Sequence, residues 1–134
     1  MTADSLDFAR PSRPAIMIPR RKNGDLQTSI VTAVPTPDGE IWVWTRGDTA
    51  KMKNLRRDPR ATLCVIEGDF RNWTHVDATA AIVRQPEALP LLDDYYRFRH
   101  GKEHDNWDGW RAEMLKDVRH LFRLTPTRVF HPVR

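Results

Sequence analysis

A short basic segment that follows a glycine-containing turn is the part of the sequence best suited to chemistry. After Gly47 come Asp48 and Thr49, either of which can cap a helix, and then Lys51 and Lys53. A helix that begins here would present amide groups, a hydroxyl and an ammonium group at its positive end. This combination indicates an anion-binding site. A basic helix that is only solvated is the alternative interpretation, and the position of the segment between two strong strands favours the anion site.

A second pattern could in principle bind zinc. His100-Gly-Lys-Glu103-His104 fits the H-x-x-E-H arrangement of inverted zinc peptidases. That chemistry needs a helix with both histidines on one face, a third ligand and a sizeable scaffold. Because Gly101 interrupts the motif and little chain follows it, we expect a charged helix end and no metal site.

Other motifs that would identify an enzyme class are absent from the sequence. It has no nucleophile elbow, P-loop, dinucleotide-binding glycine pattern or cysteine-pair metal site. No Ser/His/Asp or Cys/His set is marked by its context, so the catalytic residues stay unknown. If the protein is an enzyme, its chemistry therefore belongs to a bound cofactor, which the polypeptide binds and orients.

Two strands must position the basic segment. Residues 41–45 alternate in polarity and size with a period of two, which is typical of a strand, and residues 61–66 form the continuous apolar run of a strand covered on both sides. Between them, Met52 and Leu55 define a narrow apolar stripe on the helix. Pro59 predicts where this helix ends, because it forces the residue before it out of the helical region.

The remaining chain predicts more strands than helices. Asn23-Gly24 favours a type I′ hairpin, since both central residues of that turn need a positive φ. Further strands are expected at 15–21, 26–34, 73–83 and 120–130, the last interrupted by Pro126. Helices are expected from Pro86 to about 100 and over 111–117, with residues 105–110 as a loop or as the start of the second helix. Five to six strands without βαβ alternation predict a mainly β fold, a small antiparallel barrel with attached helices.

Composition places the chain among globular proteins with one domain. Of its 134 residues 30% are charged and 40% are hydrophobic, which suits a real but small core. Residues 1–14 have two prolines and no hydrophobic period, so we expect an N-terminal arm that is flexible or that orders against a partner subunit. A single domain is expected over residues 15–134. The lone Cys64 excludes an intrachain disulfide and is expected to be a buried, inert thiol.

Charge and hydropathy limit the partners. The net charge of +4 suits either a phosphate-bearing small molecule or a nucleic acid. No apolar run has the length of a membrane span, and no charged region followed by an apolar one opens the chain. We therefore expect no membrane partner and a cytoplasmic location.

The segment TAKMKNLRRDPRATLCV at residues 49–65 resembles a known family. It is similar to the Thr/Ser-x-Lys-x-x-Asn-Leu-x-x-Asp-Pro-Arg-x-x-Leu segment of pyridoxamine 5'-phosphate oxidase-like split-barrel proteins, and most similar to members that use flavin or the deazaflavin coenzyme F420. The resemblance continues in order through RKNG at 21–24, the turn at 38–39, the strand at 73–83 and LTPTRVF at 124–130. It implies an antiparallel split β-barrel that forms a homodimer with cofactor sites at the interface.

The resemblance also implies a set of site residues. In the family, the end of the strand before the basic helix and the first turn of that helix hold the cofactor phosphate, and the preceding strand passes beneath the flavin ring. The matching positions are Trp44, Thr45, Thr49, Ala50, Lys51 and Lys53 for the phosphate, Ser29, Ile30 and Val31 for the ring, and Trp73 from the second subunit.

One departure from the family pattern bears on the choice of cofactor. Ala50 stands where relatives usually have a second basic residue. The loss of a cationic contact argues against tight FMN binding, and less against F420, whose longer oligoglutamyl tail can use Arg56, Arg57 or the basic N-terminal arm. We therefore expect an oxidoreductase that uses F420 to transfer a hydride to or from a small organic substrate. An FMN-dependent reductase or oxidase is the alternative.

Two classes of protein without catalysis also fit the sequence. A cofactor-binding protein would need the same phosphate site. A small barrel that binds nucleic acid would use basic stretches such as Arg10–Arg13 and Arg20–Lys22. The aromatic residues form no evident exposed stacking series, so we do not expect nucleic acid to be the partner.

Overall fold

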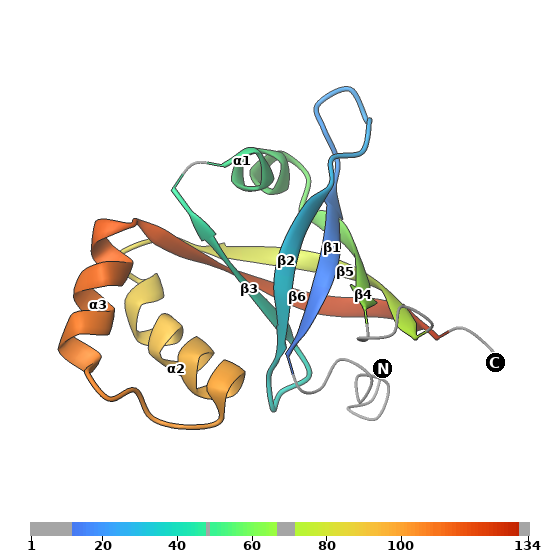
Figure 1. The fold of residues 1–134 in the computed structure, drawn as a ribbon. Coiled ribbons are helices and arrows are strands. Elements are labelled where there is room, and N and C mark those ends of the chain that lie inside the picture. The colour runs from blue at the N-terminus through green and yellow to red at the C-terminus, as the bar shows by residue number, and fades with distance from the viewer. Residues whose placement is uncertain (1–11, 48, 67–71, 132–134) are drawn as a thin grey trace.

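The computed structural model describes residues 12–47, 49–66 and 72–131. Within these ranges the strands form one barrel, and the helices pack against it (Figure 1). In chain order the elements are β1 (Arg13–Pro19), β2 (Ser29–Pro35), β3 (Ile41–Arg46), α1 (Ala50–Arg57), β4 (Arg60–Ile66), β5 (Trp73–Val83), α2 (Ala88–His100), α3 (Trp107–Lys116) and β6 (Arg119–Phe130). None of the helices in the described ranges is long and apolar enough to cross a membrane.

The six strands form a closed barrel in the order β1-β2-β3-β6-β5-β4. Every neighbouring pair is antiparallel. Alternate residues of each strand point into the barrel, as in Ile41, Val43 and Thr45 of β3, which are at most 2% exposed. The mainly β antiparallel barrel expected from the sequence is therefore confirmed.

Helix α1 closes one end of the barrel. Thr49 is its N-cap, with its hydroxyl accepting a hydrogen bond from the Met52 amide, and Asp58 ends it in an extended conformation before Pro59. Met52 and Leu55, 0% and 2% exposed, pack into the barrel core. The predicted stripe and helix end are both confirmed.

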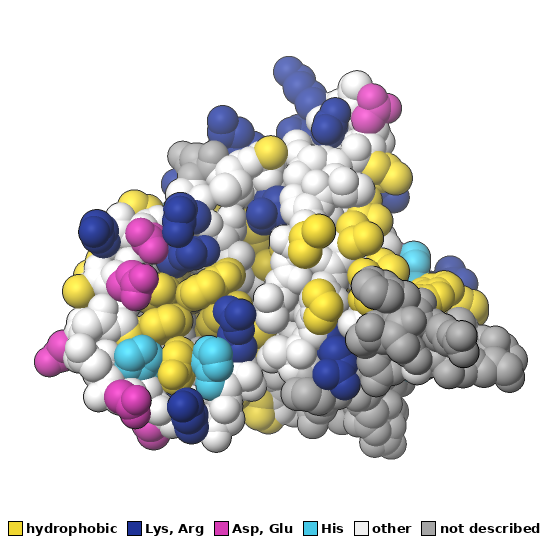
Figure 2. Space-filling model, in the orientation of Figure 1, with side chains coloured by type: hydrophobic (Ala, Val, Ile, Leu, Met, Phe, Trp, Pro, Cys, Tyr) yellow, Lys and Arg dark blue, Asp and Glu magenta, His cyan; other side chains and the backbone are white. Residues whose placement is uncertain are grey.

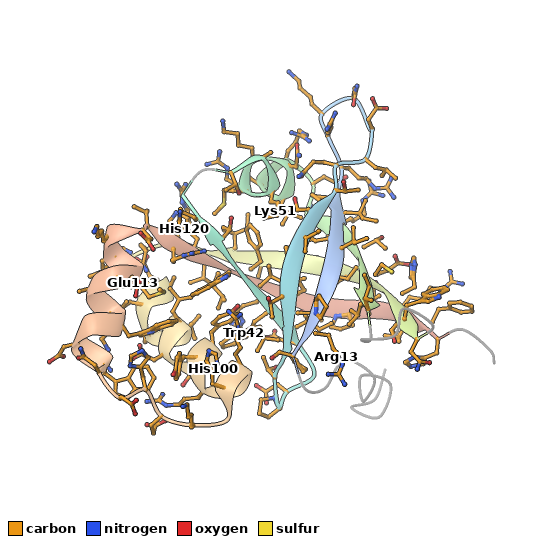
Figure 3. All side chains as sticks on the ribbon, viewed as in Figure 1. Arg13, Trp42, Lys51, His100, Glu113 and His120 are labelled. Atoms are coloured by element: carbon orange, nitrogen blue, oxygen red, sulfur yellow. The ribbon has the colours of Figure 1, made fainter. Side chains whose placement is uncertain are left out.

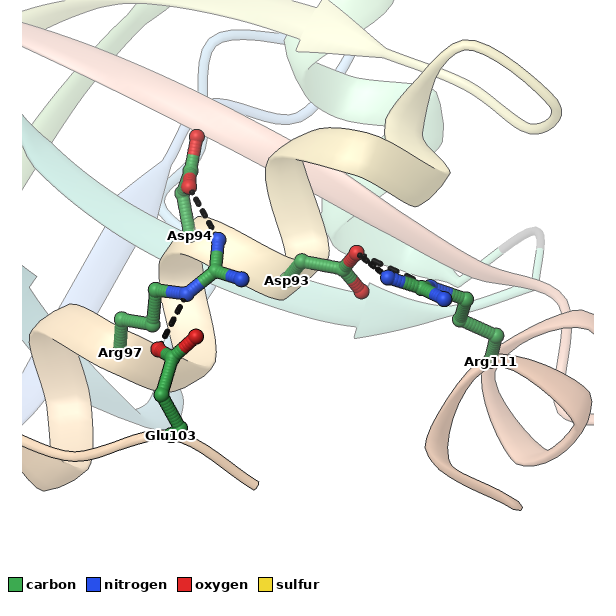
Figure 4. Close-up of polar contacts among 5 residues, drawn as sticks. All are labelled: Asp93, Asp94, Arg97, Glu103 and Arg111. Atoms are coloured by element: carbon green, nitrogen blue, oxygen red, sulfur yellow. Dashed lines mark hydrogen bonds and ion pairs between the residues drawn. The ribbon is translucent and has the colours of Figure 1, made fainter. Parts of the chain in front are cut away.

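Helices α2 and α3 lie together against the outer face of β3 and β6 (Figure 1). Their apolar residues form a second core with Val34, Trp42 and Leu121 from the strands. Ion pairs join the two helices and the loop between them (Figure 4). Arg111 donates to Asp93 at 2.8 and 3.0 Å, and Arg97 donates to Asp94 at 3.0 Å and to Glu103 at 2.6 Å.

The β1–β2 hairpin corrects one prediction. The expected type I′ turn is wrong, because Gly24 has a φ of 88° but Asn23 does not share a positive φ. Instead the Gly24 amide donates to the Arg21 carbonyl and the Arg21 amide donates to the Asp25 carbonyl. This is the longer type of hairpin loop, in which a glycine in the left-handed region follows an ordinary turn.

Several element boundaries, and the expected break in the last strand, also differ from the predictions. Strand β6 is not interrupted at Pro126, because the pairing shifts from Ala78↔Pro126 to Asp77↔Arg128 and Thr127 forms a bulge. A bulge accommodates a residue that cannot donate to the sheet. Helix α3 begins at Trp107, within the segment that the sequence left open as loop or helix start, because the Asn106 side chain accepts a hydrogen bond from the Gly109 amide and caps it.

The N-terminal boundary lies earlier than expected. Arg13 and Pro14, assigned to the arm by the sequence, are part of β1, where Arg13 pairs with Ala33. Residues 1–11 of the predicted arm lie outside the described residues.

Candidate functional site

A cleft of about 440 Å³ opens beside the start of α1. Its walls come from β2, the end of β3 and the start of β6, and Lys51 lies at the beginning of α1 next to it (Figure 3). Figure 2 shows this part of the surface as a hollow between the helical side of the molecule and the hairpin side, with several Lys and Arg side chains around it. The cleft is therefore a cavity with basic groups at its edge.

Six of the ten predicted site residues meet in this cleft. They come from three separate elements, so the fold assembles what the sequence separates. The six are Ile30, Val31, Trp44, Thr45, Thr49 and Lys51.

The other four predicted residues do not line the cleft. Ser29 opens β2 and accepts a hydrogen bond from the Gln27 side chain at 2.7 Å. Ala50 and Lys53 are exposed on α1. Trp73 begins β5, where its ring lies 6.0 Å from that of Phe130. Its contribution from a second subunit stays a prediction.

Two threonine hydroxyls mark the floor of the cleft. Thr45 ends the inward-facing row of β3 and is 2% exposed, and its Oγ1 lies 2.9 Å from Oγ1 of Thr49. The Thr49 hydroxyl also accepts from the Met52 amide at 3.3 Å. Helical geometry leaves the first-turn amides of α1 without intrahelical acceptors, which creates a positive pole beside this hydroxyl pair.

Three cationic side chains converge on the same cleft. Lys51 comes from α1, Arg46 from the end of β3 and Arg119 from the start of β6. Arg46 and Arg119 are paired residues in the β3–β6 ladder. Among the described residues that line the cleft there is no carboxylate, although Asp117 lies 3.7 Å from Arg46. An anion entering the cleft would therefore meet three positive charges.

The positive charges in the cleft act on one another. Partial burial lowers the pKa of Lys51 from its usual value, and the positive charge of Arg119 lowers it further. Burial and the nearby Arg46 likewise lower the pKa of Arg119. The Arg119 Nε atom is buried and has no hydrogen-bond partner among the described residues. A bound anion would relieve this repulsion and supply the missing acceptor.

Trp44 forms the wall behind these cations. Its ring stacks on Tyr95 at 5.1 Å and on Trp110 at 5.9 Å, so α2 and α3 hold it in place. The Arg119 guanidinium lies over the same ring, 4.1 Å from its centroid, which is within cation–π range. The helices attached to the barrel thereby fix both the tryptophan and the arginine of the cleft.

Sequence reasoning missed four residues of the cleft: Pro14, Thr32, Arg46 and Arg119. Arg119 matters most, since it supplies a second partly buried cation where the alanine at position 50 had suggested the loss of one. No local signal identifies it, because its place depends on the pairing of β3 with β6, which lie far apart in the sequence. The outward position of Arg46 could have been found from the alternation of β3.

The H-x-x-E-H residues lie at the far end of α2 and in the loop after it. Glu103 is bound to Arg97, and the His104 Nδ1 accepts from the Asn106 amide at 2.8 Å. The rings of His100 and His104 pack on Tyr96 at 4.4 and 4.6 Å. These contacts give each side chain a structural role at the end of the helix.

Comparison with known proteins identifies the fold of this chain. Among solved structures, a conserved hypothetical protein from Mycobacterium tuberculosis is 26% identical, with 98% of this chain and 83% of that chain covered and a TM-score of 0.79. An F420 reductase is 16% identical over 92% of both chains, with a TM-score of 0.67. A pyridoxamine 5'-phosphate oxidase-related, FMN-binding protein from Nostoc punctiforme is 15% identical over 96% of this chain and 76% of that chain, with a TM-score of 0.68.

The sequence itself matches a family model over nearly its whole length. The model describes pyridoxamine 5'-phosphate oxidase and matches residues 2–131. The barrel, the basic α1 and the cleft between β2, β3 and α1 all lie within this match. The chain therefore belongs to the pyridoxamine 5'-phosphate oxidase family.

Proposed function

We propose that this protein is an oxidoreductase that binds the deazaflavin F420, or a flavin, and transfers a hydride to or from a small organic substrate. The convergence of Lys51, Arg46 and Arg119 on one cleft carries the proposal. The Thr45–Thr49 hydroxyl pair and the positive end of α1 add neutral donors beside these charges. Such a set suits the phosphate end of a flavin-type cofactor.

The residues of the cleft fit the two ends of such a cofactor. Lys51, Thr49 and Arg119 would hold the phosphate, and the buried Nε of Arg119 is a donor that an anion could satisfy. Ile30 and Val31 would provide the apolar wall for the ring. When bound, the cofactor supplies the hydride chemistry, and these side chains bind and orient it.

The number of cations bears on the choice between F420 and FMN. Position 50 carries no basic residue, but the cleft still has positive charges besides Lys51. Arg46 of β3 and Arg119 of β6 supply them. Three cations exceed what one phosphate needs, so the cleft favours a ligand with further anionic groups, such as the oligoglutamyl tail of F420. FMN is the second candidate, and the fold shared with the FMN-binding protein supports it.

The other expectations are carried forward as predictions. A homodimer would bring Trp73 of a second copy toward the cleft, and a small molecule would bind at the resulting interface. The cytoplasmic location also stays a prediction.

Cofactor titration tests the proposed function. Protein from a host without deazaflavin should purify nearly colourless, bind added F420 at micromolar or tighter concentrations, and bind FMN more weakly. Binding should quench tryptophan fluorescence because Trp44 lines the cleft. The variant Lys102→Ala removes an exposed lysine after α2, outside the cleft, and should bind like the wild type.

The possible outcomes separate the function classes. Stoichiometric FMN in the purified protein would favour the FMN enzyme. Tight F420 binding without oxidation of the reduced cofactor by a panel of small enones and quinones would favour a cofactor-binding protein without catalysis. Indifference to both cofactors, together with single-stranded nucleic acid binding that weakens steeply with salt, would overturn the oxidoreductase proposal.

A further inference from the structure

The positive charge of the cleft beside α1 continues along the ring of Trp44 to the end of α2. Trp44 lines the cleft, and two guanidinium groups lie over its ring. The Arg119 guanidinium lies 4.1 Å from the ring centroid, and that of Arg99, in the last turn of α2, lies 5.6 Å from it. Arg119 also acts on Lys51, whose pKa is lowered by burial and by this positive charge. The three cations therefore form a connected series across the tryptophan.

The hydroxyl of Tyr95 lies near both arginines and adds no negative charge to them. Tyr95 stacks on Trp44 and is fully buried. Burial raises its pKa to about 12, although the positive charges of Arg99 and Arg119 act in the opposite direction. The hydroxyl is therefore neutral at physiological pH, and it does not neutralise either guanidinium.

Arg99 differs from Arg97, two residues earlier on α2, in having no acidic partner. Arg97 forms ion pairs with Asp94 at 3.0 Å and with Glu103 at 2.6 Å (Figure 4). Within the part of the chain that the structure describes, no carboxylate forms an ion pair with Arg99. Its guanidinium lies over the Trp44 ring instead, so its N–H groups are available to an anion.

The balance of charge around Trp44 is positive even when nearby carboxylates are counted. Asp117 and Glu113 act on Arg119, and Asp117 also lies 3.7 Å from Arg46. These two carboxylates face four cations, which are Lys51, Arg46, Arg119 and Arg99. A single cofactor phosphate at the start of α1 would leave the last of these without an anion.

We propose that Arg99 and the Trp44 ring form a second anion subsite of the cofactor cleft, which binds a carboxylate of the ligand. This inference rests on the proposed function, because it takes Lys51 and Arg119 as the site of the cofactor phosphate. The planar guanidinium can give a carboxylate two parallel hydrogen bonds, and the indole ring beneath it reduces its contact with water. The carboxylate can belong to the cofactor itself or to the organic substrate bound beside it.

Titration calorimetry with phosphonates tests the subsite without any enzymatic activity. Alkylphosphonates of increasing chain length carry only the group that the phosphate site binds, and phosphonocarboxylates of the same lengths carry a terminal carboxylate in addition. At the length that spans the two subsites, the wild type should bind the phosphonocarboxylate roughly tenfold more tightly than its alkylphosphonate, the scale of one charge-assisted hydrogen bond. At shorter lengths this gain in affinity should be smaller.

Variants of Arg99 show whether this residue is the source of the gain. Arg99→Gln should abolish the gain and leave alkylphosphonate affinity unchanged, and Arg99→Lys should retain part of it. The control Lys102→Gln removes an exposed lysine just after α2 and should behave like the wild type. Absence of a gain at every length, or a gain that survives in Arg99→Gln, would overturn the proposal.

Cofactor titration then distinguishes the two sources of the carboxylate. F420 carries carboxylates and FMN carries none, so a loss of F420 affinity alone in Arg99→Gln would assign the carboxylate to the cofactor. Unchanged F420 affinity, with weaker binding of cinnamate to F420-loaded Arg99→Gln, would assign it to the substrate. If F420 binds and neither affinity depends on Arg99, the proposal is wrong. If neither cofactor binds while the phosphonocarboxylate gain persists, the proposed cofactor is wrong and the subsite remains.

Discussion

Lys51 occupies a position where three influences meet. It follows the Thr49 cap by two residues, it is partly buried, and it faces the positive charge of Arg119. In the absence of an anion these influences all disfavour its charged form. An anion that binds between Lys51 and Arg119 would stabilise the charged form of Lys51. This lysine should therefore contribute strongly to ligand affinity and little to folding.

Replacement of Lys51 measures that contribution. Lys51→Ala should cost about 1.5–3 kcal/mol of cofactor binding, or roughly a ten- to hundredfold loss of affinity, since it removes a charge-assisted hydrogen bond. Its unfolding free energy should hardly change. Arg60→Ala, which lies outside the cofactor cleft, serves as the control in the same titration. Equal losses of cofactor affinity in both variants would mean that the basic helix is only a solvated surface and does not bind the phosphate.

The lowered pKa of Lys51 predicts how cofactor affinity depends on pH. Lys51 should lose its proton below the usual value of 10.5 in the free protein, so binding should weaken as the pH rises toward that value. Lys51→Arg keeps a positive charge throughout this range, and its affinity should fall less over the same interval. Parallel pH profiles for the wild type and Lys51→Arg would contradict the assignment.

At the scale of elements, the two attached helices stabilise the cleft from behind. Tyr95 of α2 stacks on Trp44 and is fully buried, and burial raises its pKa to about 12, partly offset by Arg99. The ion pair between Asp93 of α2 and Arg111 of α3 holds the same layer together (Figure 4). The rigidity of the Trp44 wall therefore depends on elements outside the barrel.

The raised pKa of Tyr95 predicts an alkaline loss of stability. The unfolded chain ionises near pH 10 and the folded one near pH 12, so this stabilising contribution is complete below pH 10 and is lost between these values. The loss should be on the order of 2 to 3 kcal/mol. Denaturant unfolding at several pH values should show a flatter profile for Tyr95→Phe, whereas Tyr96→Phe should retain the wild-type decline.

At the scale of the whole molecule, one face of the barrel is unusually apolar. Ile30, Ile16 and Cys64 lie side by side in the register of β2, β1 and β4, and their side chains point outward. Ile30 is 84% exposed. Figure 2 shows hydrophobic side chains gathered over β1 and β2 on this side. Exposed apolar surface of this kind is expected to be covered by a second copy of the chain.

This face predicts a homodimer. Sedimentation at micromolar protein should report a dimer, and Ile16→Arg should shift it toward the monomer because a charge would be buried at the interface. Leu115→Arg, at an exposed leucine of α3, should leave the dimer intact. A monomeric wild type would exclude the composite site to which Trp73 was assigned.

The sequence by itself determined the unit that carries the cleft beside α1. The alternation of β3, the stripe of Met52 and Leu55 and the stop at Pro59 are local signals, and the structure confirms them. The sequence allowed Asp48 or Thr49 as the cap of α1, and the structure has Thr49 there. The six predicted residues that line the cleft come from this unit or from the strand before it. Local patterns suffice there because capping and side-chain alternation depend on neighbours in the chain.

Tertiary structure decided which distant residues joined that unit. Arg119 enters the cleft only through the pairing of β3 with β6, and His75, Asp77 and Thr62 meet only through the register of β4 and β5. Barrel closure also turned Cys64 outward, where it is partly exposed instead of the buried thiol expected from its apolar run. Register and closure follow from contacts across the whole barrel, and a shift of one residue would move every side chain to the opposite face.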